Sequence, residues 1–192
     1  MNKHLLLTII VVLITYPVVP RTPSTVDVSA EEYAVYSAVI ANMFETKSKL
    51  LVIQDATATD FTEESSKQDD QYFRRMFPTL AEEVVKDYKD RNNEPVRLKD
   101  SFKLNVKHVL IEKQEIEKIF KGGGWWEEFY KRYPNSGGLI MLSRVGFNAA
   151  MNQAMVYIQH GCGGLCGTGH YVLLEKSADK WRVVKQSMVW IS

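Results

Sequence analysis

The residue types best suited to chemistry concentrate in one short segment, residues 160–170, which reads HGCGGLCGTGH. It contains both cysteines of the chain, Cys162 and Cys166, and two of the four histidines, His160 and His170. Five glycines lie between them. Because glycine adopts the positive φ angles that tight turns need, this segment predicts a tight loop between two strands, with the glycines supplying those angles. We call it the cysteine loop.

Three kinds of chemistry fit the cysteine loop. A disulfide between Cys162 and Cys166 would close its tip, because an oxidising compartment favours the bridge and the glycines let the Cα atoms approach to about 5.5 Å. The two cysteines with His160 and His170 also supply the ligand types of tetrahedral zinc, although familiar zinc loops place both histidines after the cysteines. A cysteine activated by a neighbouring histidine is the third interpretation, but its spacing differs from the Cys-x-x-Cys of oxidoreductases. We favour the disulfide and expect neither a metal nor another cofactor.

Arg144 completes a candidate polar site with His160 and His170. It lies in a predicted strand, from which it could either hold an anionic group inside the domain or form a surface ion pair. A small exported hydrolase would need such imidazoles within hydrogen-bond reach of its substrate. Ser143 lacks the sequence signature of a serine hydrolase. We therefore expect a non-catalytic binding or accessory domain, with the hydrolase as the alternative.

Residues 125–133, WWEEFYKRY, concentrate five aromatic rings and four charges. They could form an aromatic platform for a carbohydrate or a peptide. The alternative that we favour is a helix whose Trp126, Phe129 and Tyr133 face a sheet while the charged side chains face water.

The pattern of apolar residues divides the chain into helices followed by strands. Ser29 is a suitable N-cap for the first helix. The predicted helices cover residues 30–45, 69–77, 78–91 (with Pro78 at the first helical position), 114–120 and 125–133, and the predicted strands cover 50–53, 102–110, 139–147, 153–160, 169–176 and 180–191.

This order of elements predicts an α+β fold in which N-terminal helices pack on a C-terminal antiparallel meander of four to five strands. A chain that begins with helices and closes on a long hairpin resembles the cystatin-like or nuclear-transport-factor-like cone. That analogy concerns the fold and implies no activity.

The N-terminus has the features of a secretory signal peptide. Lys3 and His4 precede an almost wholly apolar run at residues 5–16, which Pro17 follows. The run is shorter than the roughly 20 residues of a membrane span. We expect a signal peptide at residues 1–24 and one domain at 25–192, in a secreted or periplasmic protein. An uncleaved anchor and a buried N-terminal element are the alternatives.

Charge argues against binding to nucleic acid. The chain has 24 basic and 23 acidic side chains and a formal net charge of +1. Removal of residues 1–24 takes away Lys3 and Arg21, which leaves 22 basic against 23 acidic side chains and a net charge of −1. Nucleic-acid binding relies on a basic field, so we expect a protein, peptide or glycan ligand of unknown identity, and no stable membrane span.

The C-terminal third of the chain resembles a family of uncharacterised secreted bacterial proteins. The shared pattern consists of FYKRYP at residues 129–134, LSRVGFN at 142–148, CGGLCG at 162–167 and YVLLEK at 171–176. The resemblance implies a bacterial source and export. The family has no established activity, so it implies no catalytic residue.

Overall fold

The computed structural model describes residues 27–44, 48–59, 70–121 and 125–192. The predicted signal peptide and the glycines at 122–124 lie outside this part of the chain. The described residues form the helices α1 (Ala30–Phe44), α3 (Asp70–Met76), α4 (Glu82–Arg91), α5 (Lys113–Lys121) and α6 (Trp125–Arg132), and the strands β1 (Leu50–Gln54), β2 (Lys107–Ile111), β3 (Ser136–Leu142), β4 (Gly146–Phe147), β5 (Gln153–Gly163), β6 (Cys166–Ser177) and β7 (Lys180–Ile191).

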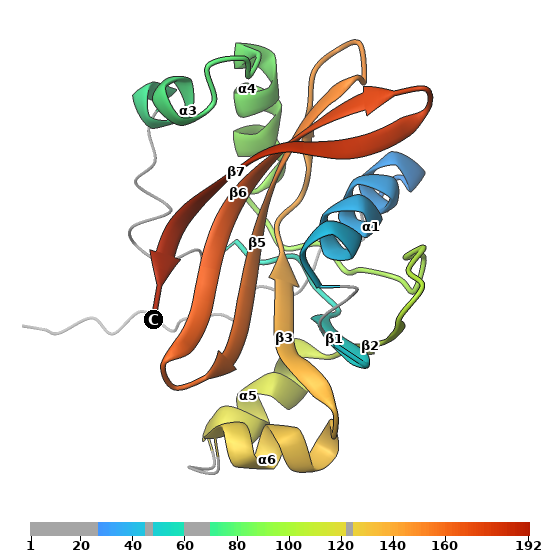
Figure 1. Ribbon diagram of the computed structural model, residues 1–192, viewed down its shortest axis with the longest axis vertical. Coiled ribbons are helices and arrows are strands. Elements are labelled where there is room, and N and C mark those ends of the chain that lie inside the picture. Colours follow the sequence, from blue (N-terminus) through green and yellow to red (C-terminus); the bar gives the residue numbers. More distant parts are fainter. Residues whose placement is uncertain (1–26, 45–47, 60–69, 122–124) are drawn as a thin grey trace, which may run out of the picture.

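The described strands form one mixed sheet in the order β2-β1-β3-β5-β6-β7, with β4 also paired to β5 (Figure 1). Strands β3, β5, β6 and β7 pair antiparallel, which confirms the predicted meander. Strand β1 pairs parallel with both β2 and β3, which the sequence did not predict. Parallel neighbours need long crossover connections, and the chain between β1 and β2 includes helices α3 and α4.

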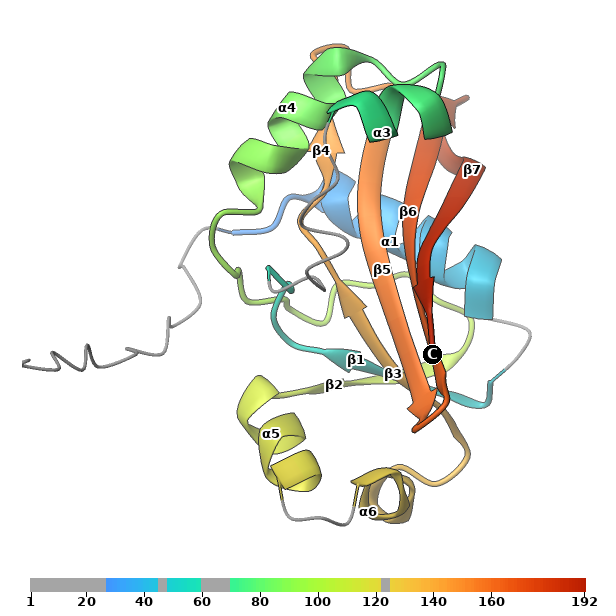
Figure 2. The same ribbon diagram turned by 90° about the vertical axis from the view of Figure 1, so that its left-hand side faces the viewer.

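Helices cover both faces of the long strands (Figure 2). Ala154, Val156 and Ile158 of β5 pack in the core beneath α1, whereas Met155 and Tyr157 pack in a second core beneath α3 and α4. A strand buried on both faces carries a continuous apolar run instead of an alternating one, which explains the sequence of β5. The α+β architecture, with N-terminal helices on C-terminal strands, is therefore confirmed.

A third core lies between α5, α6 and strands β1, β2 and β3. Phe129 is fully buried there, and Trp126 and Tyr133 pack against it. The charged side chains Glu127 and Lys131 are exposed. The aromatic segment therefore forms the helix that we favoured, and most of its rings contribute to the core.

The predicted strand 102–110 is wrong in its first half, because the strand begins only at Lys107. The preceding residues pack against α1. The Phe102 ring centroid lies 5.3 Å from that of Tyr33, and the Lys103 backbone N–H donates to the Ser37 hydroxyl oxygen at 2.9 Å. These contacts with the helix replace the backbone ladder that a longer strand would have formed.

The predicted start of the helix 78–91 at Pro78 is also wrong, because α4 begins at Glu82. The side chain of Gln153 holds the preceding turn against the sheet. It accepts a hydrogen bond from the Ala81 N–H at 2.6 Å and donates to the Thr79 carbonyl at 2.9 Å. Tertiary contacts thus override the local preference of proline for the first turn of a helix.

The predicted strand 139–147 is interrupted and forms two strands, β3 and β4. At the break, the Ser143 hydroxyl accepts the Tyr157 backbone N–H at 2.9 Å. The Arg144 backbone N–H turns to the Asn92 side-chain oxygen at 2.7 Å. Side chains therefore satisfy the backbone groups where the ladder is broken, and Arg144 leaves the sheet.

Candidate functional site

Cys162 and Cys166 form a disulfide at the tip of the β5–β6 hairpin, with a Cα–Cα distance of 5.1 Å. The preferred interpretation of the cysteine loop is confirmed. The ladder extends to the Gly163–Cys166 pair, so the stem of the hairpin is longer than predicted. Disulfide-bonded sulfurs are neither thiolate ligands nor nucleophiles, so the zinc and reactive-cysteine interpretations do not apply to this state. Among the described residues, no group of three or more His, Cys, Asp or Glu side chains could hold a metal ion.

The glycines of the cysteine loop do not serve the purpose that we predicted, because none of the five has a positive φ. Close contacts explain three of them. A Cβ atom at Gly169 would lie 2.1 Å from Trp190 Nε1 and 2.1 Å from the Tyr157 hydroxyl oxygen. A Cβ atom at Gly167 would lie 2.9 Å from the Trp190 ring, and a Cβ atom at Gly161 would lie 3.1 Å from the Trp126 ring. These glycines are needed because aromatic rings pack on the hairpin backbone.

The two histidines of the loop share one face of the hairpin. His160 of β5 pairs with Thr168 of β6, and His170 lies two residues after Thr168 on β6, so the three side chains share one face of the hairpin. Ile158, which pairs with His170, packs in the core beneath α1, so this face is the one towards α1. The three side chains line a cavity of about 470 Å³, which we call the histidine pocket. Its lining residues are Asn42, Met43, Phe44, Ser48, Gly137, His160, Thr168, His170 and Gln186.

Neighbouring groups hold the wall and the rim of the histidine pocket. His160 Nε2 donates to the Gly137 carbonyl oxygen at 2.7 Å, and its ring centroid lies 4.9 Å from that of Phe44. At the rim, Gln186 Nε2 donates to Asn42 Oδ1 at 2.9 Å. The pocket therefore has an oriented imidazole on its wall and two amide groups at its entrance.

His170 contributes a buried polar atom without a partner to the wall of this pocket. Its Nδ1 atom is buried and has no hydrogen-bond partner in the structure. Burial lowers the pKa of His170, which favours the neutral ring. A neutral imidazole with an unsatisfied nitrogen is suited to accept or donate one hydrogen bond to a ligand.

The lowered pKa of His170 predicts a loss of stability on acidification. The unfolded chain takes up a proton on His170 near the ordinary pKa of about 6.5, before the folded chain does so. The contribution to stability is therefore complete above that pH and is lost as the pH falls towards the lower folded pKa. We expect the free energy of unfolding to fall less steeply between pH 7.5 and 5.5 in His170→Gln than in the wild type. Urea denaturation at both pH values measures this difference, and equal slopes would contradict it.

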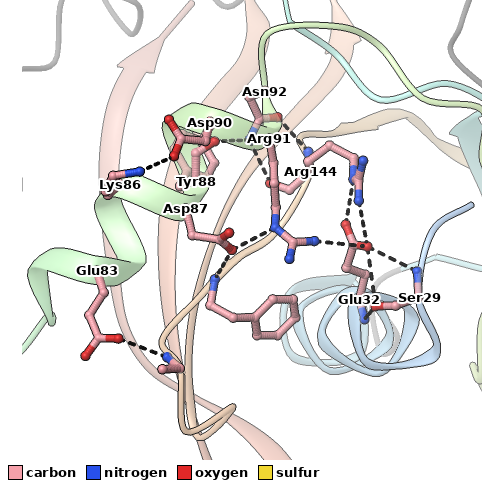
Figure 3. Close-up of polar contacts among 12 residues, drawn as sticks. Ser29, Glu32, Glu83, Lys86, Asp87, Tyr88, Asp90, Arg91, Asn92 and Arg144 are labelled. Atoms are coloured by element: carbon pink, nitrogen blue, oxygen red, sulfur yellow. Dashed lines mark hydrogen bonds and ion pairs between the residues drawn. The ribbon is translucent and has the colours of Figure 1, made fainter. Parts of the chain in front are cut away.

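Arg144 does not line the histidine pocket. It forms a two-pronged ion pair with Glu32 of α1, with Nε–Oε1 at 2.7 Å and Nη2–Oε2 at 2.9 Å (Figure 3). Glu32 is 0% exposed. Burial by itself lowers the pKa of Arg144, but the hydrogen bonds and the charge of Glu32 outweigh that effect and raise it. The sequence thus proposed three polar residues, of which the structure brings together only His160 and His170.

Glu32 also caps its own helix. The Glu32 N–H donates to the Ser29 hydroxyl oxygen at 3.2 Å, and the Ser29 N–H donates to Glu32 Oε2 at 3.1 Å. This reciprocal arrangement is a capping box. Ser29 is therefore the N-terminal cap that the sequence predicted, while the pairing of Glu32 with Arg144, 112 residues away, has no local sequence signal.

The ion pair continues into a polar network around α4 (Figure 3). Arg91 Nη1 lies 3.7 Å from Glu32 Oε2, and Arg91 Nε donates to Asp87 Oδ2 at 2.7 Å. The same Asp87 oxygen accepts the Phe147 backbone N–H at 2.8 Å. These bonds join α1, α4 and β4, so we assign Arg144 to this structural network.

Sequence reasoning missed the other polar residues of the histidine pocket. Asn42 lies near the end of α1, Ser48 lies two residues before β1, and Gln186 lies in the middle of β7. Single polar residues on separate elements form no motif. Only the register of the hairpin and the position of α1 bring them to the two histidines.

Comparison of the chain with protein-family models, curated proteins and solved structures found no match. None of the described helices is long and apolar enough to cross a bilayer. The resemblance to secreted bacterial proteins and the analogy to a cone therefore stay predictions.

Proposed function

We propose that this chain is an exported, non-catalytic binding domain that holds a small uncharged ligand in the histidine pocket. The observation that carries the proposal is the buried, unpartnered Nδ1 of His170 in the wall of a cavity of about 470 Å³. Buried polar atoms usually have hydrogen-bond partners, and an unsatisfied one in a pocket of ligand size suggests a bound group.

The chemistry of the lining favours an uncharged ligand. The described residues that line the pocket include no Lys, Arg, Asp or Glu. A charged ligand group would lose its hydration there without gaining a charged partner, which is costly. Hydroxyl and amide groups, in contrast, match the imidazoles and the amides of Asn42 and Gln186, while Phe44 and Met43 offer apolar contact. A sugar has this combination of groups, so we propose a glycan-type ligand over a charged peptide.

The hydrolase alternative has weaker support. Its proposed pocket included Arg144, but the guanidinium of Arg144 is engaged with Glu32 outside the histidine pocket. An acid–base pair of imidazole and carboxylate would also need an Asp or Glu within hydrogen-bond reach, and the described lining contains none.

Three observations support export. The disulfide favours an oxidising compartment, because cytosolic thiols are normally kept reduced. The sequence of residues 1–24 has the features of a signal peptide, and the C-terminal third resembles secreted bacterial proteins. All three fit a secreted or periplasmic protein, and the resemblance adds a bacterial origin.

The proposal is tested by NMR titration of ¹⁵N-histidine-labelled protein. The neutral probes are glucose, galactose and N-acetylglucosamine, and the charged probes are acetate, phosphate and methylamine. We expect a neutral probe to shift the His170 ring resonances and to bind about fivefold or more weakly to His170→Gln. A ligand group left without its buried partner costs about 1–3 kcal/mol, and 1.4 kcal/mol corresponds to tenfold in affinity. His108→Gln is the matched control, because His108 pairs with Asp100 at 2.7 Å outside the pocket.

Three outcomes would contradict the proposal. The first is a His170 shift with the charged probes alone. The second is equal loss of binding in both histidine variants, and the third is no shift with any neutral probe. Hydrolysis of nitrophenyl esters or glycosides that His170→Gln abolishes would favour the hydrolase instead.

A further inference from the structure

The tip of the β5–β6 hairpin presents one apolar side chain almost fully to solvent. Leu165 is 92% exposed, the largest value among the described large hydrophobic residues. It lies in the two-residue turn between Gly163 and Cys166. Ile191, which is 68% exposed, pairs with Thr168 near the same end of the sheet. A leucine in this position contributes nothing to the core, so packing does not explain it.

The tip is also rigidly supported. The disulfide closes the turn on both sides of Leu165. From below, the Tyr130 hydroxyl of α6 donates to the Cys162 carbonyl at 2.9 Å, and the Trp126 ring packs under Gly161. In Figure 1, α6 lies at the end of the molecule towards which the hairpin tip points. The backbone on either side of Leu165 is therefore held before any partner binds.

Gly164, the residue before Leu165, has no side chain that would cover the backbone of the turn. A Cβ atom at Gly164 would meet no heavy atom within 4 Å, and the φ of Gly164 is not positive. Neither space nor conformation requires a glycine here, unlike at Gly169. The missing side chain does allow another molecule to approach the turn closely.

We propose that this tip, Gly164 and Leu165 between the bonded cysteines, is a preformed anchor that inserts into an apolar pocket of a partner protein. The proposal goes beyond the proposed function, because the histidine pocket lies on the α1 face of the sheet and the tip lies beyond it. A rigid loop loses little conformational entropy on binding, which favours its insertion into a pocket of fixed shape. A few side chains buried in pockets of the partner carry most of the binding energy in many protein interfaces.

The same observations favour a protein over the other possible occupants. A lipid surface has no fixed shape, so the disulfide and the support from α6 would add little to insertion. A second copy would have to receive Leu165 in a cavity such as the one between α3 and α4, with the apolar residues Phe73, Leu80 and Val85. Contact between two unlike surfaces of one chain builds a ring or an open fibre of copies, which the test below detects as an adduct with a second copy.

The test begins with a photo-crosslinking amino acid, p-benzoylphenylalanine, at position 165 of the full chain in the cells that produce it. The matched control carries the same group at Val184, which is 49% exposed on β7. We expect a discrete protein adduct from position 165 that position 184 does not give. Mass spectrometry identifies the partner, which is then purified for binding measurements.

Binding to the purified partner completes the test. We expect Leu165→Ala to weaken the affinity about tenfold or more, as loss of a central anchor does, and Leu165→Met and Val184→Ala to leave it nearly unchanged. The double variant Cys162→Ser/Cys166→Ser keeps the leucine but releases the loop, so its affinity should fall several-fold. Equal affinity of Leu165→Ala and the wild type would overturn the proposal. So would adducts that contain lipid or a second copy of the chain, equal adducts from both positions, or no adduct at all.

Discussion

Replacing Arg144 with methionine is expected to lower the free energy of unfolding by about 3–5 kcal/mol, because the variant leaves the carboxylate of Glu32 buried without its main partner. Arg91 lies 3.7 Å from the same carboxylate and offers only a longer contact. Urea denaturation at pH 7 measures the loss. The matched control is Lys86→Met, which removes an exposed ion pair with Asp90 and should leave stability nearly unchanged.

A second variant shows whether the buried charge is the cause. Glu32→Gln combined with Arg144→Met removes both charges, while the glutamine can still accept the capping hydrogen bond from Ser29. We expect the double variant to recover a large part of the stability that Arg144→Met alone loses. If the double variant is as unstable as the sum of the two single variants, the loss arises from packing and not from the unpaired carboxylate.

Local signals predicted the parts of this fold that depend on neighbouring residues. Ser29 with Glu32 three residues later is a helix start that can be read from the sequence, and the spacing of Cys162 and Cys166 allows a bridge of known geometry. The hairpins also followed from short turns between apolar runs. In each case the groups that interact lie within a few residues of each other.

The features that sequence reasoning missed depend on contacts between distant segments. The apolar pattern of β1 indicates a strand, but it carries no information on whether β2 and β3 lie beside it in parallel. The burial of Arg144 depends on Glu32, which another helix supplies. The glycines of the cysteine loop led to a correct prediction of the hairpin, but the reason given, positive φ angles, was wrong. Three of these glycines are required because aromatic rings of β7 and α6 pack on the hairpin backbone.

The candidate site was predicted only in part for the same reason. Two histidines ten residues apart on a predicted hairpin can be placed on one face once the register is known, and His160 and His170 do line one pocket. The register depends on the exact turn, which the sequence left open. The remaining wall of the pocket comes from α1, whose position on the sheet is set by the core beneath it.

The close approach of α4 to β4 predicts a second large loss of stability, from the substitution Gly146→Ala. A Cβ atom at Gly146 would lie 2.5 Å from Tyr88 N, 2.5 Å from Tyr88 Cβ and 2.6 Å from Tyr88 Cα. These are backbone atoms and the Cβ atom, whose positions do not depend on the side-chain rotamer, so no change of the Tyr88 rotamer removes the clash. Gly146→Ala therefore forces α4 away from the sheet.

Such a shift also stretches the bonds that hold α4 in place, from Asp87 to the Phe147 N–H and from Asn92 to Arg144. We expect Gly146→Ala to lower the free energy of unfolding by about 3 kcal/mol, at the upper end of the usual cost of overpacking. The matched variant is Gly164→Ala, where a Cβ atom meets nothing within 4 Å and stability should change by no more than about 0.5 kcal/mol. Urea denaturation of both variants measures the contrast. Equal stabilities would mean that α4 can move on the sheet without loss, and that the network joining it to Arg144 does not hold it in place.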